Sequence, residues 1–433
     1  MIEKRLGYRE IALFFFPLLL NVQLMSISHT IINGALARLD NYVTALAGFS
    51  VAIVVHIFIS SPSYQNPTIS LTLIRGKKSL IGVMTFIGLV AVYTTVLMLI
   101  LVATPVGDFF FLKILGTPAE VVVETKKALA IMMVLPLFTG LRSLSQGLLI
   151  KARRTGLVSF ATGVRVVALL GYLSIGQLWF SGAQLGAFAL ASCVITESLV
   201  ITWLAWKTHS PFKKNVEEKN IAQIIRYALP LAFSSFLQQT IPLLISSIVG
   251  RLSDGPLALA AFGLIQGFLF LLAGPMRNLQ QAYLTLVKTE RDYRTLLKFS
   301  VTIAGTLGIL LILTAGPLNN LVVGKILGAD PEIRLYLRFS LGACALFPIF
   351  YGGTSLLRGW FAGADQTIKL SRATIAKCCF LAIVWWPLVN FQLPVSGIAI
   401  AVGLLVSAEI LEATYLYFMR QHQPLEVRQL APF

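Results

Sequence analysis

The chain of 433 residues is 57% hydrophobic and 12% charged, with a mean hydropathy of +0.81. Soluble domains contain about 45–50% apolar and about 25% charged residues, so a soluble globular protein is excluded. The 35 Lys and Arg residues exceed the 18 Asp and Glu residues by 17. Most of these cations lie in short clusters between long apolar stretches, as loops beside a membrane would place them. Nucleic-acid binding is therefore a poor interpretation of the basic charge.

Apolar stretches separated by Gly, Pro and charged residues predict twelve membrane-spanning helices, because about 20 apolar residues cross a bilayer. The basic start is followed by an apolar run without a small-residue cleavage site, which favours a first helix over a signal peptide. The expected helices cover residues 8–37, 41–74, 78–104, 118–149, 155–180, 183–208, 221–250, 255–287, 293–317, 330–363, 367–391 and 394–419.

The distribution of Lys and Arg predicts the orientation. With both termini cytoplasmic, 22 of these cations lie inside and 8 lie outside, as the positive-inside rule requires. We therefore expect a multi-pass protein of the cell (inner) membrane with both termini in the cytoplasm. The four cysteines fall in apolar stretches, which indicates buried thiols and neither disulfides nor a metal site. No cofactor is expected.

The chain is an internal duplication. Residues 17–75 align without a gap on 230–288 with an offset of 213, and residues 113–155 align on 325–367 with an offset of 212. Pro, Gly and charged residues match together. The predicted fold class is all-α integral membrane: twelve transmembrane helices in two six-helix bundles related by a parallel repeat. The expected division is a bundle over 1–209, a cytoplasmic linker over 210–220 and a bundle over 221–433.

Two similar bundles around a central cavity suggest alternating access, in which one bundle rocks against the other. Matched positions in the two halves are candidate hinges, because they interrupt helical hydrogen bonding. Ordinary transmembrane proline is the alternative. These positions are Pro62, Pro136, Pro275, Pro348 and the pair Gly352–Gly353.

Once the 22 inside and 8 outside cations are subtracted from 35, five cations remain in the membrane interior, together with three acids. The repeat aligns Arg165 with Lys377 and Glu197 with Glu409. Equal depth on consecutive helices predicts two ion pairs, Arg165–Glu197 and Lys377–Glu409, which lower the cost of burying each charge. The alternative role for Glu197 or Glu409 is proton coupling. The third acid, Glu412, is left without an assignment.

With these pairs made, Arg142, Arg277 and Arg358 have no obvious acidic partner, and a bare guanidinium in hydrocarbon costs several kcal/mol. Arg binds phosphate and carboxylate through two parallel hydrogen bonds. We expect Arg277 to be the main contact of an anionic substrate, supported by Arg142 and Arg358; headgroup or backbone contacts are the alternative. Neutral groups that could join them, or could instead serve helix packing, are His29, Asn33, Tyr64, Gln65, Asn66, Gln239, Asn278 and Gln281.

The chain resembles the multidrug/oligosaccharidyl-lipid/polysaccharide (MOP) exporter superfamily, which contains the MATE transporters, and within it the progressive-ankylosis (ANK-type) proteins. The similar stretches are 26–37 (SISHTIINGALA), 242–251, 274–283 and 147–151. The resemblance implies a six-plus-six arrangement and export of pyrophosphate, nucleotide or citrate-like anions.

Two departures separate the chain from other members. Cation-extruding MATE transporters generally carry a carboxylate in the first or seventh helix, and here Glu10 at the edge is the nearest acid. Lipid-flippase relatives carry several Arg residues in helices one and two, and here only Arg38 qualifies.

The resulting hypothesis is a monomeric secondary active exporter of a small anion, coupled to H⁺ or Na⁺. The alternatives are a MATE-type multidrug cation antiporter, a lipid-linked precursor flippase, or a scaffold without transport. Catalytic and phosphate-loop motifs are absent, so an enzyme is not expected.

Overall fold

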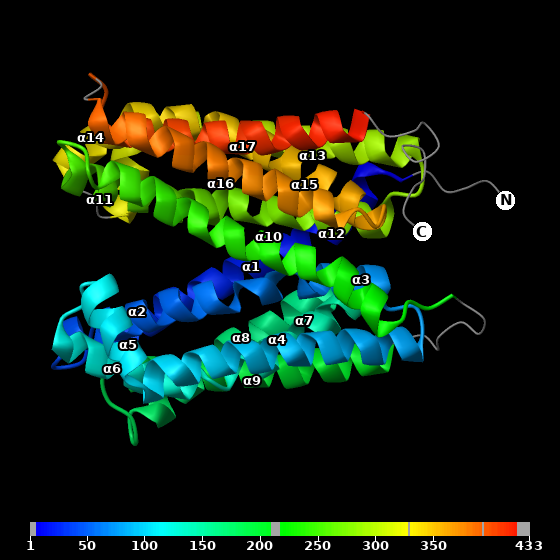
Figure 1. Ribbon diagram of the computed structural model, residues 1–433, viewed down its shortest axis with the longest axis horizontal. Coiled ribbons are helices and arrows are strands. Elements are labelled where there is room, and N and C mark those ends of the chain that lie inside the picture. Colours follow the sequence, from blue (N-terminus) through cyan, green and yellow to red (C-terminus); the bar gives the residue numbers. More distant parts are fainter. Residues whose placement is uncertain (1–5, 209–216, 328–329, 392–393, 422–433) are drawn as a thin grey trace. The chain divides into compact units, whose positions relative to one another are not determined.

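The computed structural model describes residues 6–208, 217–327, 330–391 and 394–421, and their regular structure is entirely helical (Figure 1). The first half contains α1 (Tyr8–Leu36), α2 (Tyr42–Ser60), η1 (Ser61–Gln65), α3 (Asn66–Leu73), α4 (Lys77–Ala103), α5 (Pro105–Asp108), η2 (Phe109–Ile114), α6 (Ala119–Met132), α7 (Leu135–Lys151), α8 (Thr155–Gly176) and α9 (Ala183–Thr208). The second half contains α10 (Ile221–Val249), α11 (Gly255–Ala273), η3 (Gly274–Asn278), α12 (Leu279–Leu286), α13 (Glu290–Ala315), η4 (Asn320–Ile326), α14 (Pro331–Ala343), η5 (Cys344–Leu346), α15 (Phe347–Gly363), α16 (Thr367–Asn390) and α17 (Gly397–Gln421).

Eleven segments among the described residues are long and apolar enough to cross a membrane. They correspond to eleven of the twelve expected spans. The remaining one, expected over 118–149, is divided into α6 with 14 residues and α7 with 17 residues. Its counterpart, α14 to α15, runs as one span over 331–363. The all-helical, multi-spanning fold class is confirmed.

The duplication seen in the sequence recurs in the helix boundaries. An offset of 213 carries α1, α2, η1 and α3 onto α10, α11, η3 and α12 without a change of length. An offset of 212 carries α7 onto α15, and α8 onto the start of α16. The same neighbours also pack together: α7 and α8 against α9, and α15 and α16 against α17. The internal repeat is therefore a property of the fold.

The chain forms two compact units. We call Phe16–Phe236 the N-terminal unit, and the residues up to Phe15 together with those from Leu237 onward the C-terminal unit. Their borders lie inside α1 and α10. Most of the expected linker, residues 209–216, lies outside the described residues, so the division at 210–220 stays a prediction.

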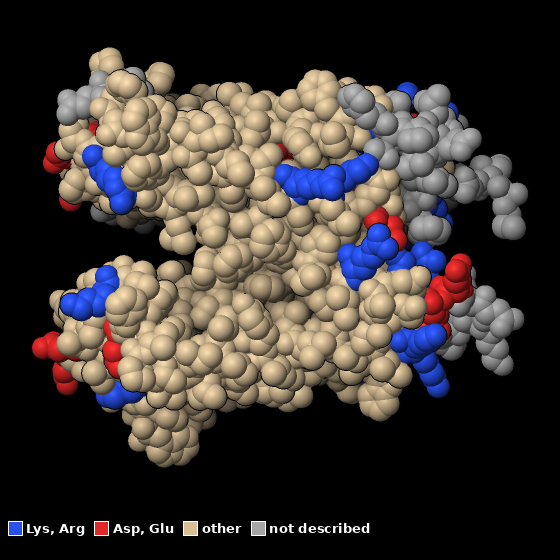
Figure 2. All heavy atoms as spheres, in the orientation of Figure 1, with Lys and Arg blue, Asp and Glu red and all other residues tan. Residues whose placement is uncertain are grey.

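Each unit has its own apolar core. Phe49, Met98 and Leu129 belong to the core of the N-terminal unit, and Phe262 and Leu311 belong to that of the C-terminal unit. Large apolar side chains also point outward, which suits a surface solvated by lipid. On the face shown in Figure 2, most charged side chains gather towards the helix ends, and the surface between is largely uncharged.

The four candidate hinge prolines each stand where a helix breaks. Pro136 and Pro348 lie in the first turn of α7 and α15, where a missing N–H removes no intrahelical bond. Pro62 and Pro275 stand at the start of the 3-10 segments η1 and η3. The Gly352–Gly353 pair, in contrast, does not interrupt α15. Hinge motion at the prolines stays a prediction.

Candidate functional site

A cluster of charged and polar groups lies buried in the N-terminal unit, where α7, α8 and α9 meet. Glu197 is 1% exposed and accepts from two guanidinium groups. Arg165 Nη1 lies 3.2 Å from Glu197 Oε2, and Arg142 Nη1 lies 3.3 Å from Oε1. The Thr162 hydroxyl donates to Glu197 Oε1 at 2.6 Å and lies 2.5 Å from Asn21 Oδ1 of α1. We call Arg142, Arg165 and Glu197 the N-terminal charge cluster.

The equivalent helices of the C-terminal unit, α15, α16 and α17, hold a second cluster. Lys377 Nζ donates to Glu409 Oε1 and, at 3.1 Å, to Glu412 Oε2. Arg358 donates to Glu412 Oε1 through Nε at 2.7 Å and through Nη2, and Nη2 also donates to Thr374 Oγ1 at 2.7 Å. All five residues are nine-tenths or more buried. We call Arg358, Lys377, Glu409 and Glu412 the C-terminal charge cluster.

Both expected ion pairs are therefore present, but the expectation that Arg142 and Arg358 lack acidic partners was wrong. Arg142 shares Glu197 with Arg165, because α7, like α8, packs against α9. Arg358 binds Glu412, which lies one helical turn beyond Glu409 on the same face of α17. The sequence argument pairs residues of consecutive helices only. The contacts of Arg142 and Arg358 instead join α7 to α9 and α15 to α17, which are not consecutive in the chain.

The two clusters differ in charge. In the N-terminal cluster two cations face one carboxylate, which leaves a net charge of +1. In the C-terminal cluster two cations face two carboxylates, which leaves no net charge. Arg142 retains 14% side-chain exposure, whereas Arg358 retains 5%. The N-terminal cluster is thus the more positive and the more accessible of the two.

Arg277 lies on η3, the 3-10 break within the membrane span 255–286, nine residues before its end at Leu286. Its side chain is exposed, and no carboxylate of the described residues pairs with it. It lies in electrostatic range of Tyr351 on α15. In the repeat, Tyr64 on η1 occupies the same position and is 39% exposed. Both helix breaks therefore present a large polar side chain.

The other polar residues predicted to bind the substrate lie on α1, on α10, and on or just after the helix breaks η1 and η3. Asn278 and its equivalent Gln65 are buried on η3 and η1. Asn66 is buried, and neither end of its amide has a partner in the described structure; the same is true of Gln281 Oε1. His29 is half-buried on α1 and interacts electrostatically with Arg165.

Asn33 on α1 is exposed, and Gln239 on α10 is half-buried. His29 therefore lies within electrostatic range of Arg165, and the described residues give no such interaction for Asn33 or Gln239.

Sequence reasoning missed three polar residues beside these clusters, Asn21, Thr162 and Thr374, and it missed the role of Glu412. One signal was available, because Thr162 and Thr374 are equivalent in the repeat and each precedes the cation of its helix by three residues. Such spacing places the hydroxyl and the cation on one helix face. The position of Asn21 depends on how α1 packs, which the sequence does not give.

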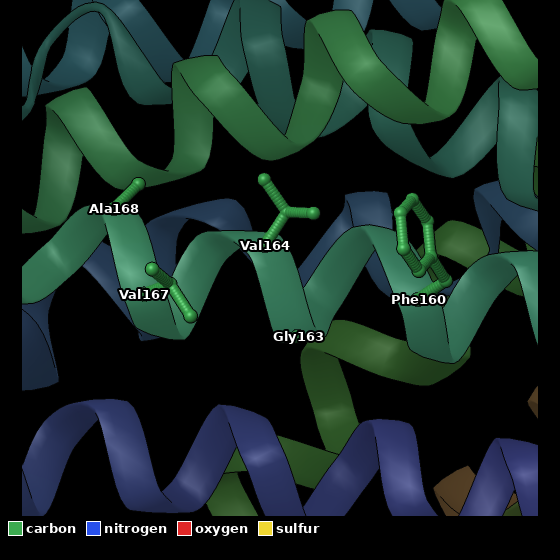
Figure 3. A pocket seen from close by; sticks show the side chains of 5 residues that line it. All are labelled: Phe160, Gly163, Val164, Val167 and Ala168. Atoms are coloured by element: carbon green, nitrogen blue, oxygen red, sulfur yellow. The ribbon is translucent and has the colours of Figure 1, made fainter.

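Within the described residues, no group of three or more His, Cys, Asp or Glu side chains could hold a metal ion. A pocket of about 450 Å³ lies along α8 and is lined by Phe160, Gly163, Val164, Val167 and Ala168 (Figure 3). Its lining is apolar, and Phe160 and Val167 are 58% and 72% exposed. This open apolar pocket offers no group that could recognise a charged cargo.

Comparison with known proteins places the fold. The MatE family profile matches residues 230–388. No curated protein matches the chain. The eukaryotic MATE transporter AtDTX14 matches over 97% of this chain and 98% of its own, with a TM-score of 0.73 and 14% identity. A MOP superfamily transporter from Pyrococcus furiosus matches over 96% and 98%, with a TM-score of 0.71 and 16% identity. The chain has the MATE transporter fold.

A third structure with this fold, a multidrug resistance MATE family transporter in an outward-facing conformation, matches over 96% of this chain and 98% of its own, with a TM-score of 0.69 and 15% identity. On this MATE fold the chain places its buried charges in α7 to α9 and in α15 to α17. Within α1 and α10, the first and seventh spans, Glu10 in the first turn of α1 is the single Asp or Glu.

Proposed function

We propose that this protein is a secondary active membrane transporter and not an enzyme, and that it exports a small organic or phosphate-containing anion by alternating access. Citrate, pyrophosphate and nucleotides are the candidate cargoes. The proposal includes a monomer in the cell membrane with both termini cytoplasmic, and coupling to H⁺ or Na⁺. The observation that carries it is an excess of cationic side chains inside the membrane-spanning segments: Arg277 without a carboxylate, and a buried cluster of net charge +1.

Arg277 is the main anion contact in this proposal. A guanidinium within a span is costly unless water or an anion meets it, and the side chain is exposed on an interrupted helix. Interrupted helices are where transporters commonly place their substrate sites. Arg142 is a supporting contact, because its side chain is partly exposed and it shares its carboxylate. Arg358 is not a substrate contact in this proposal, because it donates hydrogen bonds to Glu412 and Thr374.

The comparisons add support of a limited kind. The Pyrococcus furiosus transporter is described by the words "reverse polarity of binding pocket suggests different function", so the MATE fold occurs with a pocket of altered polarity. In this chain α1 and α10, the counterparts of the helices whose carboxylate the resemblance associates with cation extrusion, hold no Asp or Glu other than Glu10 in the first turn of α1. The resemblance to ANK-type proteins agrees with an anionic cargo and remains part of the proposal.

A multidrug cation antiporter is the second candidate, because a structure of similar fold is a multidrug resistance transporter. Efflux from proteoliposomes separates the two candidates. Vesicles are loaded with citrate, pyrophosphate or ATP in one series and with a cationic dye in the other. We expect efflux of at least one anion; movement of the dye alone would reject the proposal.

The Arg277→Ala variant tests the assigned contact. It should lose anion efflux and keep its folded yield, because no carboxylate of the described residues depends on Arg277. Lys298→Ala, which removes an exposed cation of α13, is the matched control and should transport normally. Unchanged efflux by Arg277→Ala would contradict the assignment.

A further inference from the structure

The two charge clusters occupy equivalent places in the repeat and differ by one carboxylate. An offset of 212 aligns Arg165 with Lys377 and Glu197 with Glu409. The same offset aligns Glu412 with Val200, one turn after Glu197 on α9. The second half therefore contains an acidic group at a position where the first half has an apolar side chain.

Glu412 shows what such an arrangement of cations binds. Its carboxylate is 1% exposed and accepts from Arg358 Nε at 2.7 Å and from Lys377 Nζ at 3.1 Å. It thereby neutralises the second of the two cations, since Glu409 neutralises the first. Burial of four charges is tolerable because each has an opposite partner.

The N-terminal charge cluster lacks this second anion. Arg142 and Arg165 share Glu197, and the cluster keeps a net charge of +1. The Nε–H groups of both guanidiniums are buried and have no hydrogen-bond partner among the described residues. Arg165 is 3% exposed. A buried donor without an acceptor is costly, most of all on a charged group, so the cluster is incomplete without an anion.

We propose that the N-terminal charge cluster binds one carboxylate or phosphate group of the transported anion, in the role that Glu412 has in the C-terminal cluster. This inference rests on the proposed function and assigns the recognition of one anionic group to Arg142 and Arg165. The buried amide of Gln146, which stands at the position of Arg358 in the repeat, adds a neutral polar group on the same helix face as Arg142. The partial exposure of Arg142 gives the ligand access.

Substitution of Val200 tests this inference directly. Val200→Glu supplies the missing carboxylate from the protein, so it should raise the thermal stability of the purified full-length chain and exclude the ligand. Calorimetric titration with citrate and with pyrophosphate should show an affinity at least about tenfold lower than in the natural chain. Val200→Gln adds a side chain of the same size without charge and should bind within about threefold of the natural chain. Arg142→Gln should also lose binding.

The outcomes separate the inference from the proposed function. Binding by Val200→Glu as tight as in the natural chain, or failure of this variant to fold, would overturn the inference, because a matched carboxylate must stabilise the cluster. Binding of chloride without binding of citrate or pyrophosphate would also overturn it. If a probe binds as expected and yet never crosses a proteoliposome membrane, the inference stands and the proposed function fails. If anions cross the membrane and Val200→Glu binds them as tightly as the natural chain does, the proposed function stands and the inference fails.

Discussion

The N-terminal and C-terminal charge clusters are two versions of one design, and their difference separates structure from function. In each cluster, a cation of one helix (α8 or α16) pairs with an acid of the helix that follows it (α9 or α17). In the C-terminal cluster Glu412 completes the charge balance, so two cations face two carboxylates. In the N-terminal cluster the balance is incomplete. In our proposal, the neutral cluster stabilises the fold and the cationic cluster binds a ligand.

The largest expected effect comes from removing the acid that has no substitute. Glu197→Gln leaves Arg142 and Arg165 buried together without a counter-charge, and breaking a buried pair in this way costs about 3–5 kcal/mol. Glu409→Gln should cost clearly less, because Glu412 still binds both Arg358 and Lys377. Thermal unfolding and monodisperse yield in detergent measure the difference. Equal losses in the two variants would show that the clusters are not balanced as described.

A second effect tests whether the two halves are packed alike. A Cβ on Gly147 would lie 2.6 Å from Ser70 Cβ and 2.8 Å from the Pro67 carbonyl oxygen. A Cβ on Gly359 would lie 2.8 Å from Tyr283 Cβ. Gly147→Ala and Gly359→Ala should therefore each lower the free energy of unfolding by about 1–3 kcal/mol, because the added methyl group overpacks the helix contact.

Gly163→Ala is the control for these variants, because nothing lies within 4 Å of its added methyl group. It should be neutral or slightly stabilising, since alanine favours the helix. The melting temperatures of the three variants decide the matter. A harmless Gly359→Ala beside a damaging Gly147→Ala would mean that the repeat does not extend to this helix contact.

The smallest effect concerns the ends of α4 and α13, which the two halves cap differently. Asp292 of α13 caps its own helix with Thr289. At α4, Glu218 accepts from the backbone N–H of Ser79 at 2.7 Å and from its hydroxyl at 2.8 Å. These hydrogen bonds lower the pKa of Glu218. The cap therefore contributes fully above the unfolded pKa of about 4.5, and its contribution is lost as the pH falls through the folded pKa.

Glu218→Gln should consequently melt slightly below the natural chain at neutral pH, and the gap should close as the pH is lowered beyond this range. Melting curves over a pH series give the measurement. A gap that stays constant with pH would show that the ionised carboxylate is not what caps α4.

Much of this architecture could be predicted from particular residues. The matched Pro62 and Pro275 predicted an interruption of the helix in each half, because proline removes the backbone donor that a continuous helix needs. The structure has the 3-10 segments η1 and η3 at these positions. The alignment of Arg165 with Lys377 and of Glu197 with Glu409 located both buried pairs. Each of these signals depends on short-range geometry or on the repeat.

The partners of Arg142 and Arg358 could not be found in the same way. They depend on how closely α7 approaches α9 and α15 approaches α17, and on which turn of each helix faces the other. Apolar helices in a membrane pack through shape and small residues, and this leaves little trace in a hydropathy pattern. Glu412 was visible in the sequence as a third buried acid, and its position three residues after Glu409 was the signal that linked it to the same cluster.

Counterflow by matched variants tests most directly whether the N-terminal cluster recognises an anion and the C-terminal cluster holds the fold. Labelled citrate, pyrophosphate or ATP is offered to proteoliposomes preloaded with the same unlabelled anion, with Arg142→Gln and Arg358→Gln reconstituted at equal amounts of folded protein. We expect exchange of at least one anion by the natural chain, a loss of at least about tenfold in Arg142→Gln, and a normal rate per folded molecule in Arg358→Gln. Normal exchange by Arg142→Gln together with loss in Arg358→Gln would contradict this account.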